Sequence, residues 1–109
     1  MKDNRLELLL DMLSNDPEDS FVRYAIAKEY ESLSDYQASL NHFLILKTKN
    51  PNYVGMYYHL AKLYEKQENL PLAMQIYDEG IAVAKKIPDF HALSELNSAR
   101  LNLEMEMEM

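Results

Sequence analysis

The chain has 109 residues, a length that suits a single domain with a modest hydrophobic core. Its 48% hydrophobic and 27% charged residues, with two Gly and four Pro, are ordinary for a folded globular protein. Asp and Glu outnumber Lys and Arg by 18 to 11, and the resulting net charge of −7 repels phosphate backbones, so we expect no nucleic-acid partner for this acidic protein.

Two further absences narrow the class of protein. The sequence contains no Cys, which excludes disulfide scaffolds, thiolate zinc sites and Cys nucleophiles, and which fits a reducing compartment. The apolar run at residues 6–10 is too short for a secretory signal core, and no stretch approaches the roughly 20 apolar residues that span a bilayer. We therefore expect a cytoplasmic protein with no membrane partner.

Hydrophobic periodicity and helix-capping residues predict an all-helical chain of about six helices. In chain order, the expected helices cover residues 3–14, 17–33, 36–49, 52–67, 70–86 and 89–104. The first and last carry apolar stripes at helical spacing, which are Leu6, Leu9, Leu10 and Leu13 and then Leu93, Leu96, Ala99 and Leu103.

Asp and Asn residues mark the expected helix boundaries. The pairs Asp16-Pro17 and Asn50-Pro51 are each predicted as an N-cap followed by the Pro that a first helical turn tolerates. Asp35 and Asn69 stand where the chain turns from one helix of a hairpin into the next, and Asp89 is predicted to cap the last helix.

Two segments of the chain align without a gap at an offset of 34 residues, as from Pro17 to Pro51. The same offset relates five further pairs, which are Ala27 and Ala61, Lys28 and Lys62, Tyr30 and Tyr64, Glu31 and Glu65, and Phe43 and Tyr77. This period is the length of one helix-turn-helix repeat unit.

The order of residues within the two copies is specific. The first copy reads Arg23-x-x-Ile26-Ala27-x-x-Tyr30, Ser39-x-x-x-Phe43 and Pro51, and the second reads Tyr57-x-x-Leu60-Ala61-x-x-Tyr64 and Ala73-x-x-x-Tyr77. This order resembles the tetratricopeptide repeat (TPR) pattern, and the chain as a whole resembles a small stand-alone TPR protein of bacterial type. It departs from the pattern at Arg23 in the bulky slot, at Ser39 in an Ala slot, and at Lys85 where a third Pro is expected.

The resemblance implies an all-α fold, a right-handed α-solenoid of antiparallel helix hairpins. Residues 1–109 would form a single TPR domain with atypical ends that close the core. Its expected parts are an N-terminal half-repeat helix (1–16), repeat 1 (17–50), repeat 2 (51–87), a capping helix (88–104) and a frayed tail (105–109). Gly80 stands in a slot where the family prefers Ala, and we expect a close helix approach there.

The first helix of each repeat has a face that its own hairpin does not bury. In proteins that the sequence resembles, this face lines the concave groove that receives a peptide. The residues that we expect to bind a partner on this face are Phe21, Tyr24, Lys28, Tyr58, His59 and Lys62. Their aromatic and cationic side chains favour a protein or peptide segment with apolar anchors and acidic character.

Other interpretations of this face remain open. Phe21 and Tyr24 could pack against the N-terminal helix instead, and Tyr58 could pack against the preceding repeat. The residues at 24 and 59 are Tyr and His, where relatives that clamp a C-terminal carboxylate would need Lys and Asn, so we do not expect that clamp. A second copy of the chain could fill the groove, making this a structural, self-associating homo-oligomer, and a small apolar ligand is a third possibility.

The sequence gives no support for catalysis. The three His, at 42, 59 and 91, lie on three different expected helices without a ligand-like partner four residues away, so we expect no metal site. His42 is interpreted as a solvated or bridging surface residue. The two Gly stand alone, so there is no Gly-rich phosphate loop, and we expect no cofactor and no enzyme activity.

Overall fold

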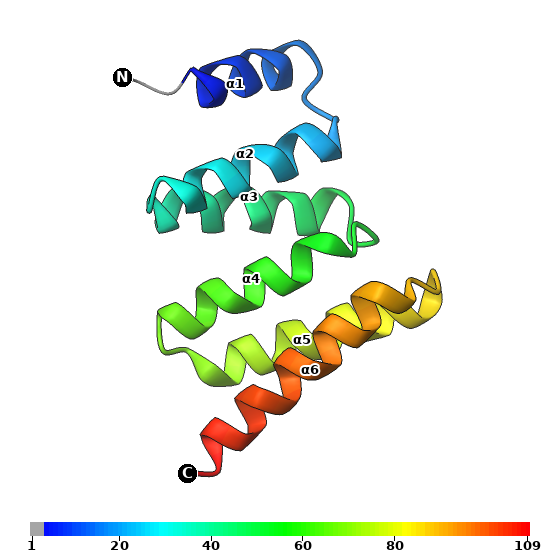
Figure 1. Cartoon of the computed structure of the whole chain (residues 1–109). Helices are drawn as coiled ribbons and strands as arrows, with labels where there is room; N and C mark the ends of the chain where they lie inside the picture. Colours follow the sequence, from blue (N-terminus) through cyan, green and yellow to red (C-terminus); the bar gives the residue numbers. More distant parts are fainter. Residues whose placement is uncertain (1–3) are drawn as a thin grey trace. The chain divides into compact units, whose positions relative to one another are not determined.

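The computed structural model describes residues 4–109, which form six α-helices (Figure 1). They are α1 (Arg5–Asn15), α2 (Ser20–Ser32), α3 (Tyr36–Lys49), α4 (Gly55–Lys66), α5 (Leu70–Lys86) and α6 (Phe90–Met107). The expected all-α class is confirmed, since the described residues are built of helix hairpins. None of these helices is both long enough and apolar enough to cross a membrane.

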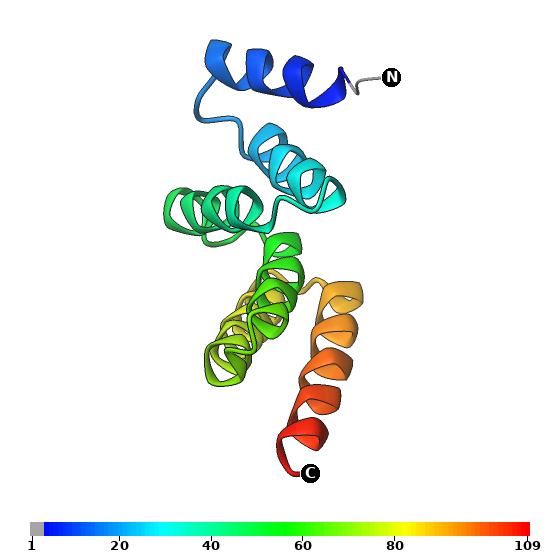
Figure 2. The same cartoon turned by 90° about the vertical axis from the view of Figure 1, so that its left-hand side faces the viewer.

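The chain divides into two compact units. The first unit, Met1–Asn50, contains α1, α2 and α3, and the second unit, Pro51–Met109, contains α4, α5 and α6. The hairpin of α2 and α3 forms the packed part of the first unit, with α1 against α2. In the second unit α5 packs against both α4 and α6, and Figure 2 separates α5 from α6, which overlap in Figure 1.

The hairpin turns have the same construction in both units. Ser34 and Glu68 adopt left-handed backbone conformations, with φ of 62° and 59°, two residues after the end of the first helix of each hairpin. Asp35 and Asn69 follow at the expected turns, and their side chains accept hydrogen bonds from backbone N–H groups three residues on, at 3.2 and 3.4 Å. Asp89 caps α6 in the same way at 3.0 Å, as predicted.

The prediction that Asp16 and Asn50 are N-caps is wrong, because each one is the C-cap of the preceding helix. A residue before Pro is pushed into an extended conformation, and both have φ near −145° with ψ near 80°. Such a residue ends the helix before it. The N-cap of α2 is Asp19, whose side chain accepts from the Val22 N–H at 3.1 Å, and α4 begins only at Gly55.

The core of the first unit lies between α2 and α3. Ile26 and Ala27 on α2 and Phe43 on α3 are fully buried. Ser39, in the slot where the family has Ala, is also fully buried, and its hydroxyl donates a 2.7 Å hydrogen bond to the Ala27 carbonyl oxygen. This bond satisfies the buried hydroxyl, which explains how the departure from the pattern is tolerated.

Helix α1 covers α2 only partly, and none of its residues is buried. Of the expected stripe, Leu6, Leu9 and Leu13 are half-buried, whereas Leu10 is exposed. The prediction for Leu10 is therefore wrong, because the contact surface follows a narrower i, i+3, i+7 line than the full run of Leu residues.

The core of the second unit is formed by three helices around α5. Tyr57 on α4, Tyr77 and Gly80 on α5, and Leu96 on α6 are all buried. A Cβ atom on Gly80 would lie 2.6 Å from the Tyr57 Cβ and 3.1 Å from the Leu96 Cδ1. The expected close helix approach at Gly80 is thus confirmed, and it involves both neighbours of α5.

Helix α5 ends where the sequence predicts, and helix α6 is longer than predicted. Helix α5 continues without a break to Lys86, as expected from the missing third Pro. Helix α6 continues to Met107, three residues past the expected end at 104. Of its expected stripe, Leu96, Ala99 and Leu103 are buried and Leu93 is half-buried.

Candidate functional site

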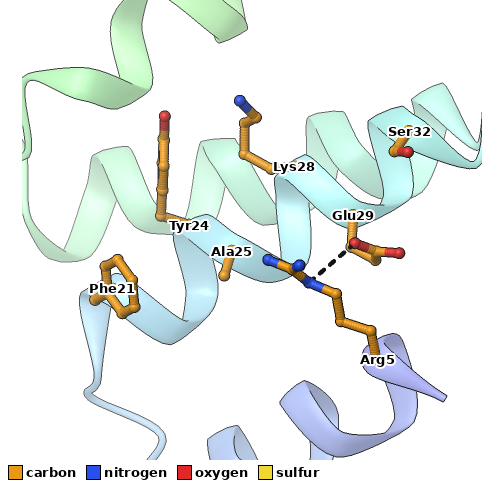
Figure 3. A pocket seen from close by; sticks show the side chains of 7 residues that line it. All are labelled: Arg5, Phe21, Tyr24, Ala25, Lys28, Glu29 and Ser32. Carbon is orange, nitrogen blue, oxygen red and sulfur yellow. Dashed lines mark ion pairs between the residues drawn. The ribbon is translucent and has the colours of Figure 1, made fainter.

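Three of the predicted binding residues share one pocket in the first unit. The pocket has a volume of about 340 Å³ and lies between α1 and α2 (Figure 3). Its lining residues are Arg5, Phe21, Tyr24, Ala25, Lys28, Glu29 and Ser32. The geometry of α2 explains the grouping, since residues 21, 25, 28 and 32 follow one another at helical spacing and form a single stripe.

The aromatic residues of this pocket are held in different ways. Phe21 follows directly after the first residue of α2, and 67% of its surface is exposed. Tyr24 is half-buried, and its ring meets the edge of Phe43 on α3 with a centroid distance of 6.1 Å. Phe21 is therefore not buried against the N-terminal helix, and Tyr24 packs on α3.

Two cationic groups stand beside these rings. The Lys28 Nζ lies 6.0 Å from the centroid of the Tyr24 ring, one helical turn further along α2, and both side chains extend to the same side of the helix (Figure 3). Arg5 reaches across from α1 and forms a 3.3 Å ion pair with Glu29. The Arg5 side chain remains 68% exposed, whereas that of Glu29 is only 12% exposed.

Sequence reasoning missed Arg5 and Glu29. Glu29 and Ser32 continue the stripe that contains Phe21 and Ala25, so extending the helical spacing by two more turns would have found them. Arg5 is on another helix, and its approach to α2 depends on how α1 packs. The sequence therefore held a local indication of Glu29 but none of Arg5.

The other three predicted residues lie together on α4 in the second unit. Tyr58, His59 and Lys62 are all half-buried. The Tyr58 and His59 rings are perpendicular, with centroids 5.4 Å apart, and the Lys62 Nζ lies 5.5 Å from the Tyr58 centroid. The Tyr-Lys pair of α2 is thus repeated on α4 with the same spacing of four residues.

Lys62 also connects this surface to the core of the second unit. Its Nζ lies 3.7 Å from the Glu65 Oε2, and the same carboxylate oxygen accepts a short hydrogen bond from the Tyr77 hydroxyl on α5. Burial of the phenol, together with the Glu65 carboxylate, raises the pKa of Tyr77 far above its usual range. One oxygen of Glu65 therefore contacts both the Lys62 ammonium and the hydroxyl of the buried Tyr77.

Of the two interpretations of His42, the structure agrees with a residue that bridges two helices and not with a solvated one. Its ring is half-buried on α3 and stacks on Tyr30 at 5.5 Å, and its Nδ1 is buried without a hydrogen-bond partner. Burial lowers the pKa of His42, and the nearby Arg23 guanidinium lowers it further. His42 belongs to the packing of the first unit, because the Tyr30 ring covers it.

The two surfaces suit noncovalent binding. Each combines an aromatic ring with an ammonium group, and such a pair offers an apolar contact beside a partner for carboxylates. Within residues 4–109, no three His, Asp or Glu side chains gather closely enough to hold a metal ion. The polar groups of the residues that line the pocket are the Arg5–Glu29 ion pair, the Lys28 ammonium and the hydroxyls of Tyr24 and Ser32.

Comparisons with known proteins point to one family. No model of a known protein family matches the sequence, and neither does any curated protein. Solved structures do. The solution NMR structure of a tetratricopeptide repeat domain protein from Salinibacter ruber is 43% identical over 82% of this chain and 90% of its own, with a TM-score of 0.77.

A crystal structure of a tetratricopeptide repeat domain protein from Salinibacter ruber is 41% identical over 79% of this chain and 97% of its own, also with a TM-score of 0.77. The TPR2B domain of yeast Sti1, solved as a complex with pHsp70, is 16% identical over 94% of this chain and 82% of its own. Its TM-score of 0.86 shows a shared fold. Because the identity to the Salinibacter protein extends over most of both chains, this chain belongs to the tetratricopeptide repeat family.

Proposed function

We propose that this chain is a non-catalytic interaction module that binds a peptide or a segment of another protein. The binding residues are those of the first-helix surfaces, which we define as Phe21, Tyr24 and Lys28 on α2 and Tyr58, His59 and Lys62 on α4. The observation that carries the proposal is the pocket of the first unit, where a largely exposed Phe21 lies beside Tyr24 and two cationic side chains.

The chemistry of the first-helix surfaces supports a partner with apolar and acidic side chains. Burial of an exposed Phe side chain by a partner is favourable, because it removes apolar surface from water. A Lys or Arg at the rim can then pair with a carboxylate of the partner. Aromatic and Arg residues are also those most enriched at binding hot spots. The yeast Sti1 domain, which shares the fold and was solved with pHsp70, supports a protein partner in general.

A photo-crosslinking experiment would test the proposal at its most exposed residue. Benzoylphenylalanine replaces Phe21 in one version of the chain and Phe90, an exposed aromatic on α6, in a second version. We expect position 21 to crosslink to a protein in cells of the source organism and position 90 to give no such product. The crosslink should disappear when Tyr24→Ala and Lys28→Glu are added.

A pull-down with matched variants covers both units. The test variant is Tyr24→Ala/Tyr58→Ala/Lys62→Glu, and the control variant makes the same types of change at exposed positions on α3 and α5, Tyr36→Ala/Lys86→Glu. Circular dichroism verifies that both variants are folded. A protein retained by the wild type and the control but lost with the test variant supports the proposal. If all three retain the same proteins, the proposed surfaces are not the binding site.

A further inference from the structure

We propose that the pocket of the first unit binds the end of α6 from a second copy of this chain. The inference deepens the proposed function and rests on it, because it names a partner for the same pocket. The contact would join two different parts of the chain, the pocket on one copy and the α6 stripe on the other. We define the α6 stripe as Leu101, Met105 and Glu108.

The α6 stripe carries exposed apolar side chains on the side of α6 that does not pack into the second unit. The opposite side of α6 is buried in the second unit through Leu96 and Leu103. Leu101 and Met105 are one turn apart and remain 54% and 57% exposed. Glu108 is the C-cap residue directly after α6, seven positions after Leu101, and its backbone conformation continues that of the helix, so it extends the line of Leu101 and Met105 and is exposed. The stripe therefore presents two apolar side chains and then a carboxylate.

The pocket has the complementary set of groups. Phe21 offers an exposed ring, and a Met thioether packs favourably against the edge of an aromatic ring. Lys28 and Arg5 supply positive charge at the pocket. Arg5 is paired with Glu29, yet a guanidinium has five N–H donors, so a side chain that is 68% exposed can bind a second carboxylate while it keeps the first.

The net charge of the chain bears on the proposed contact between the pocket and the α6 stripe. The chain has a net charge of −7, so two copies repel each other on average. A favourable contact between copies must therefore bring a local positive region against a local negative one. The pocket sets two cationic side chains, Arg5 and Lys28, against one carboxylate, Glu29, so its balance is positive, and residues 104–108 carry three Glu.

The size of the contact predicts weak association. A pocket of about 340 Å³ receives a few side chains, and interfaces below about 1,200 Å² belong to transient complexes. The contact is also heterologous, since each copy that uses its pocket leaves its own stripe available. We therefore expect weak self-association that increases gradually with concentration.

Charge reversal on each side of the contact tests the inference with the full chain. Lys28→Glu places a negative charge in the pocket, and Glu108→Lys places a positive charge on the α6 stripe. Sedimentation equilibrium measures self-association at total concentrations of about 10 µM to 1 mM, the range in which weak contacts are populated. We expect each variant alone to associate about fivefold to tenfold more weakly than the wild type.

Mixing the two variants in equal amounts should restore association, because the acidic pocket of one then meets the basic stripe of the other. Lys86→Glu, which makes the same charge change at an exposed site on α5, is the control and should associate like the wild type. Met105→Asp removes an apolar anchor and should weaken association about tenfold. Unchanged circular dichroism shows that these variants are folded.

Three results would overturn the inference. They are a wild type that stays monomeric to about 1 mM, charge-reversed variants that associate as strongly as the wild type, and a mixture that associates no more strongly than either variant. A different result would contradict the proposed function, namely crosslinking at position 21 that is no stronger than crosslinking at position 90. A monomeric chain that still crosslinks to another protein through Phe21 therefore contradicts only the further inference.

Discussion

Gly80→Ala is a sensitive test of the packing that we describe for the second unit. Gly80 lies in the interior of α5, where Ala is intrinsically favoured over Gly by about 1 kcal/mol. If the packing around it were loose, the substitution would stabilise the protein. The structure predicts the opposite, because the added Cβ would lie 2.6 Å from the Tyr57 Cβ and 3.0 Å from its Cγ.

The magnitude follows from how firmly Tyr57 is held. Its Cβ is fixed to the α4 backbone, its ring is buried, and its hydroxyl donates a 2.5 Å hydrogen bond to the Pro51 carbonyl oxygen. The ring therefore cannot swing away, and α4 and α5 must move apart. Overpacking costs about 1 to 3 kcal/mol, and we place this site in the upper half of that range. After subtraction of the helix-propensity gain, the net loss is about 1 to 2 kcal/mol.

Urea and thermal unfolding monitored by circular dichroism would measure this loss, with a melting temperature lowered by roughly 4 to 10 °C. Ala82→Gly is the matched control, since residue 82 is an exposed position on the same helix and reports the propensity effect alone, about 1 kcal/mol of destabilisation. Both variants should therefore be less stable than the wild type, although their changes in helix propensity are opposite. An equal or higher stability for Gly80→Ala would refute the close packing of α5 against its neighbours.

Three further predictions concern stability and its dependence on pH. Because the pKa of Tyr77 is raised, the folded chain keeps a proton that the unfolded chain loses, so the stability from this group is present below about pH 10 and is lost as the pH rises further. Tyr77→Phe should lower the unfolding free energy at neutral pH by about 1.5 to 3 kcal/mol, through loss of the hydrogen bond to Glu65, and should flatten this alkaline fall in urea titrations. Because burial lowers the pKa of His42, the contribution of this residue to the unfolding free energy is present above about pH 6.5 and is lost as the pH falls. His42→Phe should therefore flatten the acid side of a plot of stability against pH. The control His91→Gln, at an exposed site, should leave that side unchanged. Glu68→Gly should raise the unfolding free energy by about 0.5 to 1 kcal/mol, because φ at this residue is 59°, and an unchanged urea midpoint would contradict the left-handed turn.

Part of the fold could be predicted because its determinants are local. Asp35, Asn69 and Asp89 each cap the helix that follows by accepting a hydrogen bond from an N–H three residues on, so the sequence pattern reports the boundary directly. Asp16 misled the same reasoning. The extended conformation imposed before Pro17 makes Asp16 the C-cap of α1, and the N-cap of α2 is Asp19, which sequence reasoning missed as a cap.

The candidate site likewise contains residues that local spacing predicts and residues that depend on packing between helices. Phe21, Tyr24 and Lys28 share one helix, and their spacing alone places them on neighbouring positions of its surface. Arg5 comes from α1, and its ion pair with Glu29 depends on the packing of two helices. The sequence left open whether His42 is solvated or bridging, and its stacking on Tyr30 across the hairpin, with a buried nitrogen, decides for the bridging position.

The sequence by itself determined the all-α class, the 34-residue repeat and the faces of α2 and α4 that carry aromatic and cationic side chains. These properties follow from contacts within a helical turn or from direct comparison of the two copies. Only the tertiary structure decided which side chains of one helix meet those of another, including the closure of the pocket by Arg5 and the tight contact at Gly80. Helical periodicity fixes direction around one axis, whereas the distance and register between two axes are set by the packing of all their side chains together.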